Sequence, residues 1–149
     1  MTTAPTAHAL PQRLRIVAAG MQFVGHFNPA APMTVAAFRT LLPFRNKLIQ
    51  VRWSGEACWT PLGDLKLGVG FENHTCHPSI GDVLFYPGGY SETELLIAYG
   101  ACSFSSRMGP LAGNHFMTIS DGRDALRELG TRVLWHGAQD LLIEADDTR

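Results

Sequence analysis

The sequence predicts a mainly β protein, a closed or nearly closed antiparallel β-barrel with one or two short flanking helices. Most of the chain after residue 47 follows a period of two in hydrophobicity, and turns rich in Gly and Pro separate its short apolar runs. The strands do not alternate with long helices, so a parallel Rossmann-type sheet is not expected. With 149 residues and 46% hydrophobic side chains, the chain can bury one core without disulfide support.

The first ordered element is predicted from alternation. Residues 13–16 alternate and residues 21–27 do so loosely, which indicates either one bent strand or a hairpin broken at Gly20. The segment before it is rich in Ala, Thr and Pro and has little apolar surface to bury. The predicted boundaries are therefore a flexible N-terminal tail at 1–12, a single domain at 13–144 and a polar C-terminal tail at 145–149.

Two helices are predicted. In the first, Val35, Phe38 and Leu41 follow at helical spacing, with Thr34 as the expected N-cap and Pro43 as the stop. The second is short. It covers residues 123–129, with Ser120 or Asp121 opening it and Gly130 closing it.

The remaining elements are predicted to be strands. Ser54 and Gly55 form a turn between two of them, and residues 65–71 alternate strictly, with Lys or Gly opposite the apolar positions. The last two read as a terminal pair. The predicted strands are 48–53, 57–59, 65–71, 82–86, 95–99, 114–119, 133–137 and 140–144.

Charge and composition exclude several classes of partner. Twelve Lys and Arg against thirteen Asp and Glu give a net charge of -1 without a basic block, so neither nucleic acid nor a membrane surface is an expected partner. No apolar run is long enough to span a membrane. Three widely spaced cysteines fit free thiols in a reducing compartment, which predicts a cytoplasmic protein.

Several ordered motifs resemble one known family. They are Trp53-Ser54-Gly55-Glu56, Glu72-Asn73-His74-Thr75, Gly81-Asp82, Tyr86-Pro87-Gly88-Gly89 with Ser91-Glu92, Tyr99-Gly100 and Gly113-Asn114-His115-Phe116. Over residues 13–144 the chain resembles the DUF3830 family, a group of uncharacterised bacterial proteins with a cyclophilin-like barrel. The resemblance implies a cyclophilin-like fold and leaves the activity open.

A cyclophilin-like fold raises the question of prolyl isomerisation, but the residues argue against it. The Phe-His-Arg motif and the Phe-Met-Gln-Gly-Gly-Asp segment of cyclophilin isomerases are both absent, and function resides in sites rather than in folds. By resemblance, related domains act on carboxylated amides of the allophanate and urea type. Amide or proton-transfer chemistry is therefore the first enzymatic expectation.

The candidate site residues lie at the ends of predicted strands between residues 52 and 116. Small barrels fill their interior with side chains, so a small polar ligand with amide or carboxyl groups is expected at a rim. Proton transfer near neutral pH points to His115, His74 and Glu56. The candidates for ligand contact combine aromatic walls with polar groups. They are Arg52, Trp53, Trp59, Asn73, Tyr86, Glu92, Asn114 and Phe116.

Metal and nucleophile chemistry find less support. His74, Cys76 and His77 offer three donors, but in an extended segment His77 points to the opposite face from the other two, so no metal is predicted. No cofactor is predicted either, since the glycine pairs lack the following Lys-Ser/Thr of a phosphate loop. The Gly-x-Ser-x-Gly pattern of a serine nucleophile is absent.

Two functional hypotheses follow. The first is a small-molecule binder, either an enzyme or an accessory protein of small-molecule catabolism. The second is a noncatalytic scaffold or sensor that forms a homo-oligomer through exposed strand edges or the Trp135 region. A purely structural role also stays open for each polar candidate, because Asn73 and Asn114 could satisfy turn backbones and the glutamates could be solvated.

Overall fold

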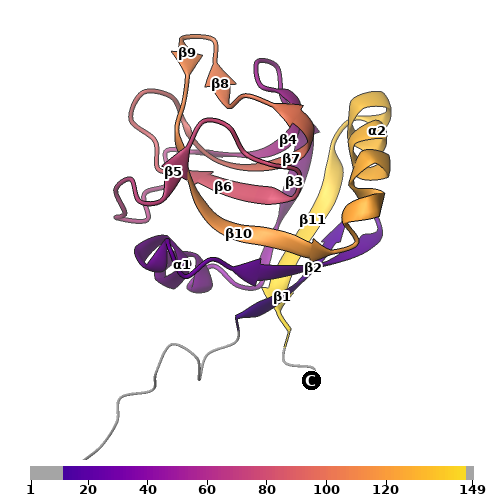
Figure 1. The fold of residues 1–149 in the computed structure, drawn as a ribbon, viewed down its shortest axis with the longest axis horizontal. Coiled ribbons are helices and arrows are strands. Elements are labelled where there is room, and N and C mark those ends of the chain that lie inside the picture. The colour runs from indigo at the N-terminus through magenta and orange to yellow at the C-terminus, as the bar shows by residue number, and fades with distance from the viewer. Residues whose placement is uncertain (1–11, 147–149) are drawn as a thin grey trace, which may run out of the picture.

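The computed structural model describes residues 12–146 and has a closed antiparallel barrel of eight strands (Figure 1). The barrel order is β2-β1-β11-β3-β4-β7-β6-β10, and β10 pairs with β2 to close it. The strands are β1 (Arg13–Ala18), β2 (Met21–Phe27), β3 (Phe44–Gln50), β4 (Gly55–Gly63), β6 (Asp82–Tyr86), β7 (Thr93–Cys102), β10 (Gly113–Asp121) and β11 (Gln139–Ala145). The predicted fold class is confirmed.

Short elements complete the fold. Strand β5 (His74–Thr75) adds to β10, and β8 (Ser105–Ser106) pairs with β9 (Gly109–Pro110) in a separate hairpin. Helices α1 (Pro32–Arg39) and α2 (Leu126–His136) lie on opposite sides of the barrel in Figure 1, and a 3-10 turn, η2 (Arg123–Ala125), leads into α2. Neither helix within residues 12–146 has the length and apolar character that crossing a membrane requires.

Residues 13–27 form a hairpin rather than one bent strand. Strands β1 and β2 pair in register from Arg13 opposite His26 to Ala18 opposite Met21. Between them Ala19 and Gly20 both have positive φ, at 53° and 78°. A two-residue turn of this hand matches the twist of the flanking strands, and Gly20 adopts it without steric cost.

The barrel interior is a filled apolar core. Alternate residues of β7 divide between two clusters, with Leu95 and Ile97 inside the barrel and Leu96 on its outer face. Phe38 of α1 and Leu129 of α2 are fully buried and join the inner cluster. The lumen is therefore occupied by side chains, as expected for a small barrel, and a ligand site must lie outside it.

A second, smaller core covers the outer face of β4, β6 and β7. Leu84, Tyr86 and Leu96 point outward from the barrel and are buried by Phe104 and Leu111, which flank the β8–β9 hairpin. The surrounding loops therefore pack on the outer face of these strands.

The predicted strand at 65–71 is wrong. These residues run without a strand partner, although Leu65, Leu67 and Val69 are half-buried while the residues between them are exposed. The alternation therefore reports an extended segment with one packed side. Gly68 has a φ of +75°, outside the β region, and no ladder of backbone hydrogen bonds forms.

The C-terminal helix is longer than the predicted range of 123–129. Helix α2 continues through Gly130 to His136, so the predicted strand at 133–137 is wrong, whereas β11 confirms the last strand. Neither Ser120 nor Asp121 opens the helix, because both belong to β10. Burial of Leu126, Leu129 and Val133 at helical spacing explains the continuation.

A residue distant in the sequence, Glu72, caps the N-terminus of α1. Pro32 occupies the first turn, and Thr34 lies inside the helix, so the predicted Thr34 N-cap is wrong. The Glu72 carboxylate instead accepts hydrogen bonds from the backbone N–H groups of Met33 (3.3 Å) and Thr34 (2.6 Å). A carboxylate at this position satisfies two free N–H groups and favours the helix dipole.

Candidate functional site

The main candidate site is a cavity of about 270 Å³ on the outer face of β4 and β7, here called the Trp59 pocket. It lies where the 51–54 turn, the loop before β7 and the β8 strand converge. Its lining residues are Val51, Arg52, Trp53, Ser54, Trp59, Ser91, Glu92, Glu94, Ser105, Ser106 and Arg107. Four of the predicted ligand contacts, Arg52, Trp53, Trp59 and Glu92, are thus brought together.

Strand register places Trp59 and Glu94 on one face. Trp59 lies opposite Leu96 and Pro61 lies opposite Glu94 in the antiparallel β4–β7 pair. Trp59 and Glu94 are therefore diagonal neighbours, within reach of each other for side chains of this length. Both point away from the filled lumen, since Leu96 belongs to the outer core.

Two hydroxyl groups hold the walls of the pocket. The buried Ser54 hydroxyl donates to the carbonyl of Ser105 (3.2 Å) and accepts from its N–H (2.9 Å), which joins the 51–54 turn to β8. The Tyr86 hydroxyl accepts from the N–H groups of Tyr90 (3.0 Å) and Ser91 (3.2 Å). Tyr86 is 2% exposed, so it positions the loop beside the pocket rather than lining it.

Glu94 is a buried acid with an unusual protonation state. It is 7% exposed, and its side chain has no hydrogen-bond or ion-pair partner within residues 12–146. Burial, followed by the negative charge of Glu92, raises the pKa of Glu94 to about 8. At neutral pH the group is mainly an uncharged acid that can donate a hydrogen bond. When a cation approaches, it can ionise and pair with that cation.

Trp59 carries an unpaired donor. Its indole N–H is the one buried side-chain polar atom in the described part of the chain that lacks a hydrogen-bond partner. An unsatisfied buried donor costs about 1–3 kcal/mol. The N–H atom itself is buried among protein atoms, so the part of Trp59 that lines the pocket is the apolar surface of its ring.

Arg52 and Arg107 are the cations of the pocket. Both are exposed, and neither forms an ion pair or a side-chain hydrogen bond with another residue in the range 12–146. Since a guanidinium can bind a carboxylate through two parallel N–H groups, each is free to meet an anionic ligand group.

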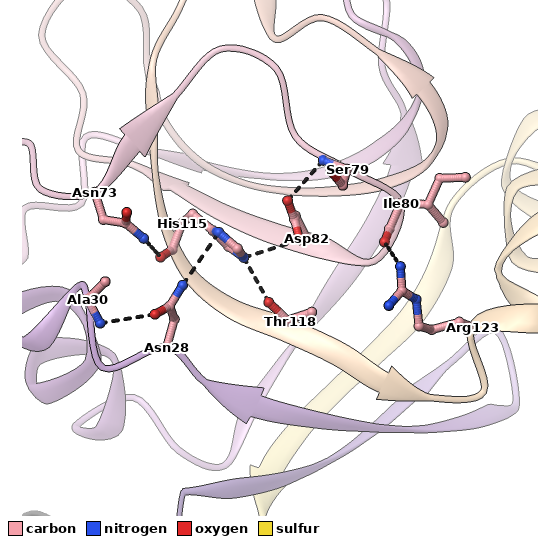
Figure 2. A network of polar contacts seen from close by, with 9 residues as sticks. All are labelled: Asn28, Ala30, Asn73, Ser79, Ile80, Asp82, His115, Thr118 and Arg123. Carbon is pink, nitrogen blue, oxygen red and sulfur yellow. Dashed lines mark hydrogen bonds and ion pairs between the residues drawn. The ribbon is translucent and has the colours of Figure 1, made fainter.

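His115 lies in a separate polar network (Figure 2). Its Nε2 is 2.8 Å from the Thr118 hydroxyl and 3.2 Å from the Asp82 carboxylate, and its Nδ1 is 3.5 Å from the Asn28 amide nitrogen. A β-bulge between His115 and Met117 turns His115 and Thr118 to the same side. Asp82 holds the ring in place from the neighbouring strand.

This network does not have the geometry of a catalytic relay. A relay needs the carboxylate on one ring nitrogen and the nucleophile on the other, whereas Asp82 and Thr118 both meet Nε2 of His115. Burial alone would raise the pKa of Asp82, but hydrogen bonds from His115 and the Ser79 N–H, with the charges of His115 and Arg123, hold it below its usual value. The arrangement ties β10 to β6 and to the α1 loop.

Asn114 and Phe116 are both fully buried. Asn114 is fully buried, and its amide bonds the Glu72 N–H (3.1 Å), the Gly70 carbonyl (2.9 Å) and the Thr34 hydroxyl (3.0 Å). Phe116 is fully buried in the inner core. Neither reaches the Trp59 pocket.

The remaining predicted residues lie elsewhere on the surface. Glu56 forms an ion pair with Arg127 of α2 (2.7 Å) and accepts from the Ala101 N–H (2.8 Å), and these bonds lower its pKa. Asn73 is exposed and donates to the His115 carbonyl (2.9 Å). His74 is exposed beside the ring of Phe71. Glu56 thus lies beside α2, whereas His74 is the register partner of Asn114 on β10, and none of the predicted catalytic residues lines the Trp59 pocket.

No group of three or more His, Cys, Asp or Glu side chains within residues 12–146 is placed to hold a metal ion. His74, Cys76 and His77 are sequence neighbours that do not form such a group.

Sequence reasoning missed Glu94 and Arg107. The sequence does mark Glu94, because it is the one charged residue in β7. It lies two residues before Leu96 and therefore faces the same side of the strand. Arg107 had none, since it reaches the pocket only because the chain folds back through the β8–β9 hairpin.

The barrel and its outer pocket define a small β-barrel protein with a candidate ligand site. The chain belongs to the DUF3830 family, described as "Protein of unknown function", which matches residues 15–144. None of the curated proteins matches the chain.

Two solved structures share the fold. The structure of McbB in complex with tryptophan has a TM-score of 0.69 at 15% identity, covering 91% of this chain and 45% of that chain. The solution structure of the hypothetical protein AF2241 from Archaeoglobus fulgidus has a TM-score of 0.60 at 19% identity, covering 92% of this chain and 96% of that chain. This chain thus spans less than half the length of McbB, and at these identities the likeness extends to the fold alone.

Proposed function

We propose that the protein binds a small organic molecule with a carboxyl or amide group in the Trp59 pocket. The observation that carries the proposal is the convergence on one cavity of the Trp59 ring, the buried and partnerless acid Glu94 and two arginines without an ion pair within residues 12–146. A ligand carboxyl or amide group would supply the acceptors that the arginines and the Glu94 proton lack in the free protein.

The other lining residues support a ligand of this chemistry. Trp53 and Trp59 offer apolar walls for the body of the molecule, and Arg52 and Arg107 offer paired N–H donors for a carboxylate. The volume of about 270 Å³ lies at the small end of ligand pockets, which suits a metabolite rather than a peptide. McbB, which has the same fold, has been solved with tryptophan, a molecule of this size and chemistry.

If the protein is an enzyme, we propose proton transfer by Glu94. The predicted catalytic residues His115, His74 and Glu56 lie outside the Trp59 pocket, whereas the pKa of Glu94, about 8, suits exchange of a proton near neutral pH. Amide chemistry in small-molecule catabolism stays the favoured class, ahead of prolyl isomerisation.

A thermal-shift screen with small amides, amino acids and carboxylates tests the binding proposal, because a ligand that binds only the folded protein raises its Tm. We expect the shift to fall in Trp59→Phe, which replaces the indole wall of the pocket with a smaller ring. Trp135→Phe is the matched control, since Trp135 is 75% exposed on α2. Ligands that shift all three proteins equally would contradict a site at Trp59.

A noncatalytic oligomeric scaffold is the second candidate. Leu134 and Trp135 are 53% and 75% exposed next to each other on α2, and such a pair is suited to contact a second copy of the chain. Light scattering after size-exclusion chromatography tests this, with an oligomer expected for the native chain and a monomer for Leu134→Glu. A cytoplasmic location and a cyclophilin-like relationship likewise stay proposals.

A further inference from the structure

The Trp59 pocket holds charges of both signs that do not neutralise each other. Arg52, Arg107 and Glu92 are exposed and Glu94 is buried, and none of the four forms an ion pair within residues 12–146. Opposite charges that line one cavity of about 270 Å³ attract each other, yet these side chains form no ion pair among residues 12–146. Different segments of the chain carry the positive and the negative side chains.

The two arginines come from one side of the pocket. Arg52 lies in the turn that the Ser54 hydroxyl joins to β8, and Arg107 follows directly after β8. The two segments that carry the guanidinium groups are therefore held together, and they form a side of the cavity suited to a carboxylate.

The two glutamates come from another segment, Glu92 directly before β7 and Glu94 within it. Their like charges interact unfavourably, and the negative charge of Glu92 adds to the burial that raises the pKa of Glu94. The free protein avoids a second negative charge by keeping Glu94 protonated. A ligand cation would relieve both effects, because it would pair with Glu92 and let Glu94 ionise.

We propose that the ligand is a zwitterion of the free amino acid type, with its carboxylate on the Arg52 and Arg107 side and its ammonium group on the Glu92 and Glu94 side. This inference rests on the proposed function and names its ligand class. A simple carboxylic acid would leave both glutamates without a partner, and a simple amine would leave both arginines without one. When the ammonium group arrives, the proton of Glu94 passes to solvent and the carboxylate pairs with the cation.

The test compares matched ligands by isothermal titration calorimetry on the full chain. A thermal-shift screen of the twenty common amino acids selects the one with the largest shift. That amino acid is then compared with its deaminated acid and its decarboxylated amine. We expect the amino acid to bind at least roughly tenfold more tightly than either analogue, since each analogue loses one charge-assisted contact.

Two variants assign the two ends of the ligand. In Glu94→Gln the preference over the deaminated acid should fall, while the preference over the amine persists. In Arg52→Met the reverse should hold. Glu128→Gln and Arg45→Met are the matched controls, because both residues are exposed and lie outside the Trp59 pocket. Both controls should keep the native preferences.

The outcomes separate the two proposals. If the deaminated acid binds the native protein as tightly as the amino acid does, and Trp59→Phe weakens it, the zwitterion is wrong and the binding function stands. If carboxylates bind and none of the twenty amino acids does, the zwitterion is equally overturned. If no amide, amino acid or carboxylate shifts the Tm, the proposed function itself fails.

Discussion

The ring of Tyr99 lies directly over Gly130, so closely that a Cβ atom at Gly130 would overlap three of the ring carbons. Tyr99 belongs to β7 and Gly130 to the middle of α2, so this contact sets how closely the helix approaches the barrel. The Tyr99 hydroxyl also donates to the Gln50 side chain (2.8 Å), which fixes the ring.

Gly130→Ala should therefore destabilise the protein by roughly 1–3 kcal/mol, because the new methyl group forces the ring or the helix to move. Helix propensity alone predicts the opposite sign, since Ala is favoured over Gly by about 1 kcal/mol. Urea denaturation measures the difference. Thr131→Ala, the next and exposed helix position, is the control and should be neutral or slightly stabilising.

Asn114→Ala should lower the free energy of unfolding by about 3 kcal/mol. The substitution leaves the Glu72 N–H, the Gly70 carbonyl and the Thr34 hydroxyl without their partner at a fully buried position. Denaturant unfolding checks this, with exposed Asn46→Ala as the control. If Asn114→Ala lowered ligand affinity and left stability unchanged, the ligand-contact role predicted from sequence would be right instead.

Asp82→Asn should cost roughly 1–2 kcal/mol at pH 7, because the folded protein holds the pKa of Asp82 below its usual value of 3.8. A carboxyl whose pKa is lowered by folding contributes stability above its unfolded pKa and loses it as the pH falls through the folded value. The gap between the native protein and Asp82→Asn should therefore narrow as the pH falls below 3.8. Exposed Asp64→Asn is the control for unfolding at pH 7 and pH 3, and a gap as large at pH 3 as at pH 7 would contradict the argument.

Glu94 should give the opposite pH dependence. Its pKa of about 8 lies above its usual value of 4.5, so the folded state binds more protons than the unfolded state between these two values. Stability should then fall as the pH rises from about 4.5 to 8, by up to roughly 5 kcal/mol. Glu94→Gln removes this dependence, while Glu128→Gln keeps it. The charged neighbours in the pocket, Glu92, Arg52 and Arg107, are unchanged in both variants.

Ligand binding should also depend on the protonation of Glu94. If the ligand carries an ammonium group, its affinity should rise as the pH increases from 6 to 8, because less work is needed to remove the Glu94 proton. Calorimetry at pH 6, 7 and 8 measures this. Glu94→Gln should show a flat response over the same range, and a native affinity that falls with pH would contradict a cationic contact at Glu94.

Much of the fold could be predicted from local pattern. Continuous apolar runs such as 83–86 and 95–99 lie in β6 and β7, because both faces of these strands are buried and every position is therefore apolar. Residues 65–71 alternate strictly without forming a strand. Alternation reports which side of an extended segment is packed, and it cannot report whether a neighbouring backbone is present to pair with it.

The placement of the candidate site residues depends on the fold for a related reason. Arg52, Trp53, Trp59 and Glu92 are predicted ligand contacts, and they line one pocket. His115, Asn114 and Glu56 looked equivalent to them in the sequence, yet each is held by contacts with other elements of the fold. Polar residues at strand ends look alike until their partners are known.

By itself, the sequence determined the class of fold and the order of most strands, because hydrophobic periodicity and turn residues act over a few neighbouring positions. Only the tertiary structure decided that α2 passes through Gly130, that the barrel lumen is filled, and that Glu94 and Arg107 share a pocket. These features depend on contacts between residues far apart in the chain, such as Tyr99 with Gly130 and Ser54 with Ser105, whose distances the linear order of residues does not contain.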